Sequence, residues 1–110
     1  MAQKTLDLTK PVTIFNRTIT KITFNEPTGG QYIDFGEPAF QARSANGMSY
    51  VVENDQAIKS YLYGCIGKDD GVGDDGAAIL AQLNFRDAVA AKRLVLSFFS
   101  DVVEALQSTK

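Results

Sequence analysis

The sequence predicts an α+β domain: an N-terminal β-hairpin, then three or four helices, the last of them a long C-terminal helix. Near the N-terminus apolar residues alternate, with Val12 and Ile14 on one face of a strand and Ile22 and Phe24 on one face of the next. In the second half of the chain apolar residues recur at helical spacings instead. A chain of 110 residues can bury a modest core, so residues 1–110 are expected to form one domain.

The β-hairpin is expected over residues 5–25. Asn16 and Arg17 lie between the two apolar runs, and asparagine tolerates the positive φ that a tight hairpin turn requires. Leu8 continues the apolar pattern toward the N-terminus and adds an extended segment before Pro11. An isolated hairpin is unstable in water, so this one must pack on helices or on another chain.

A corner between strand and helix is expected at Glu26, Pro27, Thr28 and Gly29. Proline has no N–H group to donate and keeps the residue before it extended, so Pro27 ends the second strand. The Thr28 hydroxyl can accept a hydrogen bond from a free N–H group at a helix start, which makes Thr28 the expected N-cap. A short helix is therefore expected over residues 28–36.

The region 28–106 is expected to be mainly helical. Residues 38–50 are interpreted as a polar connection that contains a Ser-Ala-Asn-Gly turn signal. An amphipathic helix follows, with Asn54 as its N-cap. Its apolar stripe consists of Ala57, Ile58, Tyr61, Leu62, Cys65 and Ile66. An acidic, glycine-rich loop over residues 68–76 comes next, and residues 77–83 are expected to form a short helical turn.

Composition narrows the possible functions. The net charge of −2 gives no cationic face for phosphates, so no nucleic-acid partner is expected. The chain has no histidine, the commonest general base, and Cys65 falls on an apolar stripe where a structural thiol is expected rather than a nucleophile. Enzymatic activity is therefore not expected. The chain contains no apolar segment typical of a signal peptide or a membrane span, which favours a soluble cytoplasmic protein without a membrane partner.

The loop 68–76 contains four aspartates, and carboxylate oxygens are the ligands that calcium prefers. The spacing of these aspartates differs from that of an EF-hand, and no glutamate closes the loop. A solvated, flexible loop is the better interpretation, so no metal and no cofactor are expected.

The last helix is expected from about Phe85 to Leu106, with Asn84 as its N-cap. Its apolar arc is much wider than the roughly 100° that a surface helix needs to pack on its own domain. One interpretation is a central core helix. The other is that one side packs inward while the other side binds another chain. The centre of that partner surface is expected at Leu96, Phe98, Phe99, Val102 and Val103.

Phe98 and Phe99 are adjacent, so their side chains diverge by about 100° around a helix. They are therefore not expected to share one pocket, and one of them should face the partner. Together with the free edges of the hairpin, the wide apolar arc favours a homo-oligomer.

Both ends of the chain resemble the tail assembly chaperones of contractile-tailed bacteriophages of the Mu-like and P2-like kind. At the N-terminal end the matching residues are Leu8, Pro11, Asn16, Ile22, Phe24, Glu26, Pro27, Thr28 and Gly29. At the C-terminal end, residues 84–87 followed by an apolar helix with Phe98 and Phe99 resemble the family's closing helix. The middle of the chain agrees only in element order. Asn25 and Gln31 stand where the family usually has a basic and an acidic residue.

This resemblance implies a non-catalytic assembly chaperone that acts in the host cytoplasm and is not retained in the mature virion. Members of the family bind the largely helical tape measure protein, keep it soluble and help recruit tail tube subunits. The tape measure protein is thus the implied partner, and the tail tube protein a further one. Two alternatives stay open: a structural tail protein of the virion, such as a tube or connector component, and a small regulatory adaptor from outside phages whose C-terminal helix docks in a partner's groove.

Overall fold

The computed structural model describes residues 2–108, and the side chains of residues 2–102. It has the expected α+β class, with the N-terminal hairpin and the long C-terminal helix, and it adds a second hairpin. The elements in chain order are β1 (Gln3–Ile14), β2 (Arg17–Asn25), α1 (Gly29–Phe35), β3 (Ala39–Arg43), β4 (Ser49–Glu53), α2 (Asp55–Cys65), α3 (Gly76–Ala81) and α4 (Phe85–Ser108).

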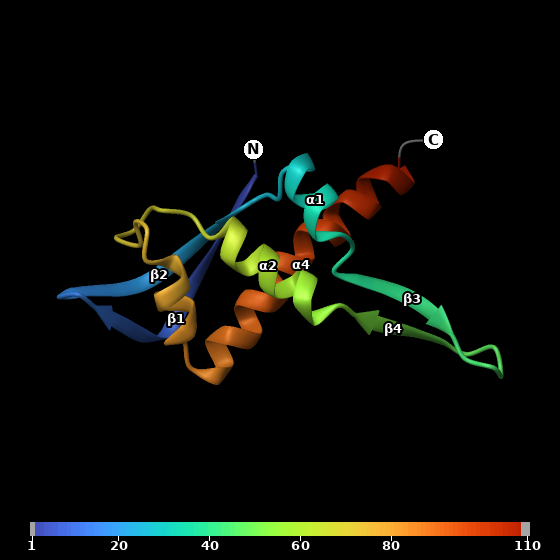
Figure 1. Ribbon diagram of the computed structural model, residues 1–110, viewed down its shortest axis with the longest axis horizontal. Coiled ribbons are helices and arrows are strands. Elements are labelled where there is room, and N and C mark those ends of the chain that lie inside the picture. The colour runs from blue at the N-terminus through green and yellow to red at the C-terminus, as the bar shows by residue number, and fades with distance from the viewer. Residues whose placement is uncertain (1, 109–110) are drawn as a thin grey trace.

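The core lies where α2 and α4 cross and pack on the β1–β2 hairpin (Figure 1). Its buried residues are Val12, Ile14, Ile19, Ile22, Phe24, Ala57, Tyr61, Cys65, Val72, Ile79, Ala91, Val95 and Phe98. The β3–β4 hairpin forms a separate sheet that projects from the end of the molecule opposite the β1–β2 hairpin. The radius of gyration is therefore 15.6 Å, larger than the value of about 13 Å that is usual for a chain of this length.

The turn of the first hairpin lies one residue earlier than expected. Arg17 pairs with Ile14 and belongs to β2, so the turn consists of Phe15 and Asn16, which have φ values of 46° and 65°. Positive φ at both positions is the arrangement of a type I′ turn, which matches the twist of a hairpin. Arg17 is held in the strand because its guanidinium donates to the Gly71 carbonyl and forms an ion pair with Asp75.

The regular pairing of β1 and β2 breaks between Asp7 and Val12, at a segment we call the β1 bulge (residues 8–11). Pro11 lies within it, where a residue without an N–H group costs no ladder hydrogen bond. The facing break in β2 lies between Ile19 and Lys21. Because of this break, Ile19 and Ile22 can both be buried, although a regular strand would place them on opposite faces.

The β1 bulge is held by Asp87, in the first turn of α4. Its carboxylate accepts hydrogen bonds from the Thr9 backbone N–H at 3.0 and 3.1 Å, from the Thr9 hydroxyl at 3.0 Å and from the Lys10 N–H at 3.3 Å. Asn84, the confirmed N-cap, accepts from the Asp87 N–H at 2.8 Å and donates to the Thr9 hydroxyl at 3.2 Å. The start of α4 and the middle of β1 are therefore locked together.

Asp87 is only 1% exposed, yet it is ionised at neutral pH. Burial by itself raises the pKa of its carboxyl group, but the hydrogen bonds from Thr9 and Lys10 favour the charged form and lower the pKa below its usual value overall. The Asp87 carboxylate thus replaces the ladder partners that the bulge lacks.

Thr28 caps α1 as expected, and the cap is reciprocal. The Thr28 hydroxyl accepts from the Gln31 N–H at 3.1 Å, and the Thr28 N–H donates to the Gln31 side-chain oxygen at 2.9 Å. The Gln31 amide also donates to the Gly64 carbonyl at 3.0 Å, which joins α1 to α2. A carboxylate at this position could make the cap but could not donate to Gly64.

The expectation of a polar connection over residues 38–50 is wrong, because β3 and β4 pair there in an antiparallel hairpin. The turn signal itself is correct. The Gly47 N–H bonds the Ser44 carbonyl at 3.0 Å, and Gly47 takes a φ of 86° that glycine adopts easily. The missed signal is the β-branched and aromatic character of Tyr50, Val51 and Val52.

The acidic loop is anchored more firmly than a solvated loop would be. Val72 is fully buried in the core, and the Lys21 ammonium lies 3.8 Å from the Asp70 carboxylate. Asp74 pairs with Lys68, while Asp75 pairs with Arg17. The carboxylates of the loop therefore turn to different cations rather than to a common point.

We predict that Thr28→Ala lowers the free energy of unfolding by about 1 kcal/mol, because the Gln31 N–H loses its acceptor. Thr28→Ser keeps the hydroxyl and is the matched control, with a smaller loss expected. Chemical denaturation measures both values. Equal losses for the two variants would mean that the cap does not contribute.

We predict that Asp87→Asn lowers the free energy of unfolding at neutral pH by about 1–3 kcal/mol, because an amide nitrogen would face the N–H donors of the bulge. Asp101→Asn is the control on the same helix. It removes an exposed ion pair with Lys4, at a cost of at most about 1 kcal/mol.

The stability that Asp87→Asn removes should depend on pH, because the pKa of Asp87 is lowered in the folded state. The stabilisation is complete above the usual aspartate pKa of about 3.9 and is lost as the pH falls through the lower pKa of the folded state. The difference between wild type and Asp87→Asn should thus shrink below about pH 4. A difference that stays constant during acid titration would contradict this assignment.

Candidate functional site

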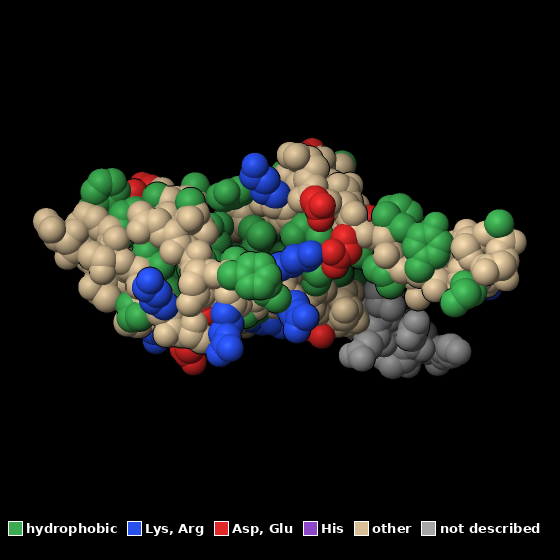
Figure 2. Space-filling model, turned by 90° about the horizontal axis from the view of Figure 1, so that it is seen from below, with side chains coloured by type: hydrophobic (Ala, Val, Ile, Leu, Met, Phe, Trp, Pro, Cys, Tyr) green, Lys and Arg blue, Asp and Glu red, His purple; other side chains and the backbone are tan. Residues whose placement is uncertain are grey.

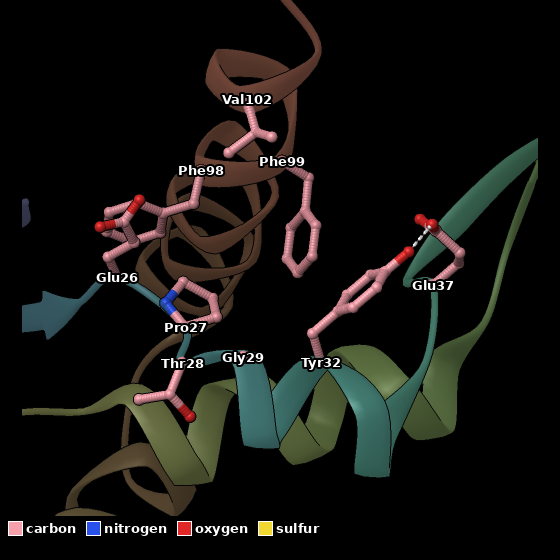
Figure 3. A pocket seen from close by; sticks show the side chains of 9 residues that line it. All are labelled: Glu26, Pro27, Thr28, Gly29, Tyr32, Glu37, Phe98, Phe99 and Val102. Atoms are coloured by element: carbon pink, nitrogen blue, oxygen red, sulfur yellow. Dashed lines mark hydrogen bonds between the residues drawn. The ribbon is translucent and has the colours of Figure 1, made fainter. Parts of the chain in front are cut away.

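An apolar groove lies between the strand-to-helix corner, α1 and the C-terminal part of α4 (Figure 3). Its volume is about 360 Å³. The residues that line it are Glu26, Pro27, Thr28, Gly29, Tyr32, Glu37, Phe98, Phe99 and Val102. The groove therefore unites the corner motif with the apolar face of the last helix, two residue sets about 70 positions apart in the sequence.

Aromatic rings form the wall of the groove on the α1 side. The Phe99 and Tyr32 rings approach from α4 and α1, with centroids 6.5 Å apart (Figure 3). Below them, the Tyr61 ring meets Phe99 at 4.9 Å and Phe35 at 5.1 Å, both in edge-to-face geometry. Burial raises the pKa of Tyr61 to about 12, and its hydroxyl donates to the Gly36 carbonyl at 2.7 Å. The wall thus rests on a rigid aromatic cluster.

Phe98 closes the groove on the side of the hairpin. It is 4% exposed, and the Lys4 ammonium of β1 lies 4.9 Å from its ring centroid. The same ammonium donates to the Ser97 hydroxyl at 2.6 Å and to the Asp101 carboxylate at 2.7 Å. β1 therefore covers part of the polar stripe of α4 and turns the apolar side of the helix toward the corner.

Two carboxylates lie at the edge of the groove, on Glu26 and Glu37. The Tyr32 hydroxyl donates to Glu37 (Figure 3). This hydrogen bond and the charge of Glu37 raise the pKa of Tyr32 above its ordinary value. The floor of the groove is apolar, whereas its edge is negatively charged.

The five residues expected to bind a partner lie in different places. Phe98, Phe99 and Val102 line the groove. Leu96 is half-buried and borders a separate depression beside the base of β3 and β4. The side chain of Val103 lies outside the residues whose side chains are described.

The expectation that Phe98 and Phe99 cannot share a pocket is wrong. The groove spans the arc between the two side chains, because the corner covers the Phe98 side and Tyr32 covers the Phe99 side. Phe98 is the inward residue of the pair, and Phe99 is half-buried in the wall. Val102, which is 48% exposed, is the most accessible of the apolar residues that α4 contributes to the groove.

The other motif residues have different places. Glu26, Pro27, Thr28 and Gly29 line the groove as well as forming the corner, whereas Pro11 lies in the β1 bulge and Asn16 in the hairpin turn. Sequence reasoning did not assign Tyr32 and Glu37 to the site. The available signal was an aromatic residue in the first turn after the corner, but its contact with Phe99 depends on the path of α4.

Conventional reactive groups are scarce near the groove. Cys65 is buried, and this burial raises the pKa of its thiol to about 11, so it is not a thiolate at neutral pH. Within residues 2–102 no three histidine, cysteine, aspartate or glutamate side chains come together as a potential metal site. In the described part of the chain no helix has the length and apolar character that a membrane span requires.

Comparison with models of protein families, with curated proteins and with solved structures found no match to this chain.

We predict that Phe98→Ser lowers the free energy of unfolding by about 3–5 kcal/mol, because it leaves a cavity in the core. Phe85→Ser makes the same change on the same helix at a position that is 85% exposed, and should cost less than about 0.5 kcal/mol. Thermal and chemical denaturation measure both. Similar losses at the two positions would contradict the inward orientation of Phe98.

Proposed function

We propose that this chain is a phage tail assembly chaperone that binds the tape measure protein, keeps it soluble and helps recruit tail tube subunits. The observation that carries the proposal is the joining of the corner motif and the C-terminal helix in one groove. These are the two segments on which the resemblance to tail assembly chaperones rests. The corner motif lines a concave apolar surface, and such surfaces are typical of binding sites. In this proposal the motif therefore serves the binding of a client as well as local folding.

The chemistry of the groove favours a helical segment as the ligand. An amphipathic helix binds by placing a few apolar side chains in a hydrophobic groove. Tyr32, Phe99 and Val102 offer such a surface, and it is supported from below by Tyr61. Rigid aromatic side chains dominate the energetics of many interfaces because they bury a large area at little entropic cost.

The carboxylates at the edge select among helices. Glu26 and Glu37 would attract lysine or arginine beside the apolar residues of the client, and would repel acidic helices. The preferred client segment is therefore apolar on one face and basic at its borders. Exposed segments of this kind aggregate readily, and covering them is what a chaperone does.

In this proposal the protein acts without catalysis, in the host cytoplasm, and is absent from the finished virion. It also associates with further copies of itself.

The test is co-expression of this chain with fragments of the candidate tape measure protein. Wild-type protein should raise the soluble fraction of the fragments, whereas Val102→Glu should abolish the effect by placing a charge in the groove. Binding to a purified fragment should weaken by about 2 kcal/mol or more. Ile33→Glu is the matched control, because Ile33 is 82% exposed on α1 and lies outside the groove lining.

The alternatives give different results. A structural tail protein would be found in purified particles. A helix-docking adaptor would leave tape measure fragments insoluble. Fragments that stay soluble with Val102→Glu would show that the groove is not the client site. In either variant, an altered circular dichroism spectrum would mean that the substitution had changed the fold, and the isosteric change Glu26→Gln would then test the groove by its effect on the salt dependence of binding.

A further inference from the structure

The β3–β4 hairpin forms an arm that extends away from the core as a sheet of only two strands. Figure 2 shows hydrophobic side chains gathered on this arm. The exposed apolar residues that it carries are Phe40, Met48, Tyr50 and Val51. A two-stranded sheet is at best marginally stable in water, and both of its edges present unpaired backbone groups. The arm therefore has the character of an interaction element.

The register of the arm shows which backbone groups are free. At its two ends, the Asn54 N–H bonds the Pro38 carbonyl at 2.8 Å, and the Ser44 N–H bonds the Met48 carbonyl at 2.9 Å. Hydrogen-bonded pairs alternate with non-bonded pairs in an antiparallel ladder, so Tyr50 and Val52 direct their backbone groups toward β3. The N–H and C=O groups of Ser49, Val51 and Glu53 point outward instead, along the free edge of β4.

We propose that β4 pairs antiparallel with β4 of a second copy of this chain, around a two-fold axis at Val51. The outward backbone groups of Val51 would then bond those of Val51 in the second copy, and the result is a continuous sheet of four strands. Ser49 lies opposite Glu53, and Tyr50 lies opposite Val52. Aromatic and β-branched residues are favourable cross-strand neighbours. Antiparallel pairing also puts the two cores at opposite ends of the shared sheet.

Charge complementarity supports a second copy as the occupant of this edge. Within one arm, Arg43 pairs with Ser49 and Ala39 pairs with Glu53. Glu53 already forms an ion pair with Lys92 of α4 at 2.7 Å. In the shared sheet, Glu53 and Arg43 of the second copy fall in the same row and on the same face, with only the small Ser49 of the second copy between them, so Arg43 would be a second cation beside this carboxylate. The two-fold axis repeats this arrangement of opposite charges, and it brings no two like charges face to face.

The edge of β3 is a poorer template for self-pairing. Its central residue is Gln41, and the same two-fold arrangement would place glutamine opposite glutamine and Phe40 opposite Ala42. The Val-rich β4 has the higher strand propensity and the larger cross-strand contacts. This comparison also gives matched controls, because Gln41 and Val51 pair with each other inside the arm and have outward backbone groups on opposite edges.

Sedimentation equilibrium tests the proposal with the full-length chain, from low micromolar to submillimolar concentration. Wild-type protein should rise from its monomer mass of 12.0 kDa toward twice that mass. Val51→Lys places two lysines face to face and should weaken association by about tenfold or more. The Val51 side chain is 63% exposed, so the monomer should keep its circular dichroism spectrum. Gln41→Lys should associate like the wild type.

Cross-linking tests the register separately. In a hydrogen-bonded antiparallel pair the Cα atoms lie about 5.5 Å apart, within the range that a disulfide spans. Val51→Cys should therefore form a covalent dimer when diamide oxidises the thiols, and Gln41→Cys should not. A wild-type protein that stays monomeric, a Val51→Lys variant that associates normally, or equal cross-linking at both positions would overturn the proposal. So would a β4 edge that binds the tape measure fragment instead of a second copy.

Discussion

The hydrogen bonds that the buried Asp87 carboxylate accepts from the β1 bulge are the constraint on which the rest of the structure depends. A break of four residues in a strand leaves backbone N–H groups without ladder partners, and these groups need other acceptors. A carboxylate in the first turn of α4 satisfies them and also suits the positive end of the helix. The bulge and the start of α4 therefore require one another, which fixes where the helix begins on the hairpin.

The path of α4 from this point determines the groove. Lys4, near the start of β1, donates hydrogen bonds to Ser97 and Asp101. The strand therefore contacts α4 both in its first turn and more than two turns later. The polar stripe of α4 is partly used in these contacts, and the apolar side meets the corner and α1. The wide apolar arc divides between the core and the surface, and the binding of another chain by the surface part stays a prediction. Val95 and Phe98 belong to the core, while Val102 remains accessible.

The groove and the arm are separate surfaces with a common support. Glu37 borders the groove, and the buried Pro38 that follows leads directly into β3. Phe99 contributes to the groove on one side and to the depression at the base of the arm on the other. A client in the groove and a second copy on β4 would thus bind opposite sides of the same rigid cluster. In the proposed function, this arrangement would let linked copies coat a long helical client.

The sequence by itself determined the features whose partners lie within a few residues. Thr28, Asn54 and Asn84 cap their helices through N–H groups three positions away, and a hydroxyl or amide in that context has few other uses. The same local reasoning placed the first hairpin and all the helices, and it identified Phe98, Phe99 and Val102 as candidate site residues.

Only the tertiary structure decided the features that need a distant partner. Asp87 looks like an ordinary first-turn acid until Thr9 is beside it, and β3 and β4 are short strands that become a hairpin only when each supplies the other's hydrogen bonds. Whether Phe98 and Phe99 share a groove depends on Tyr32 and on the direction of α4. Contacts between residues far apart in a chain are set by the packing of whole elements, which no local pattern encodes.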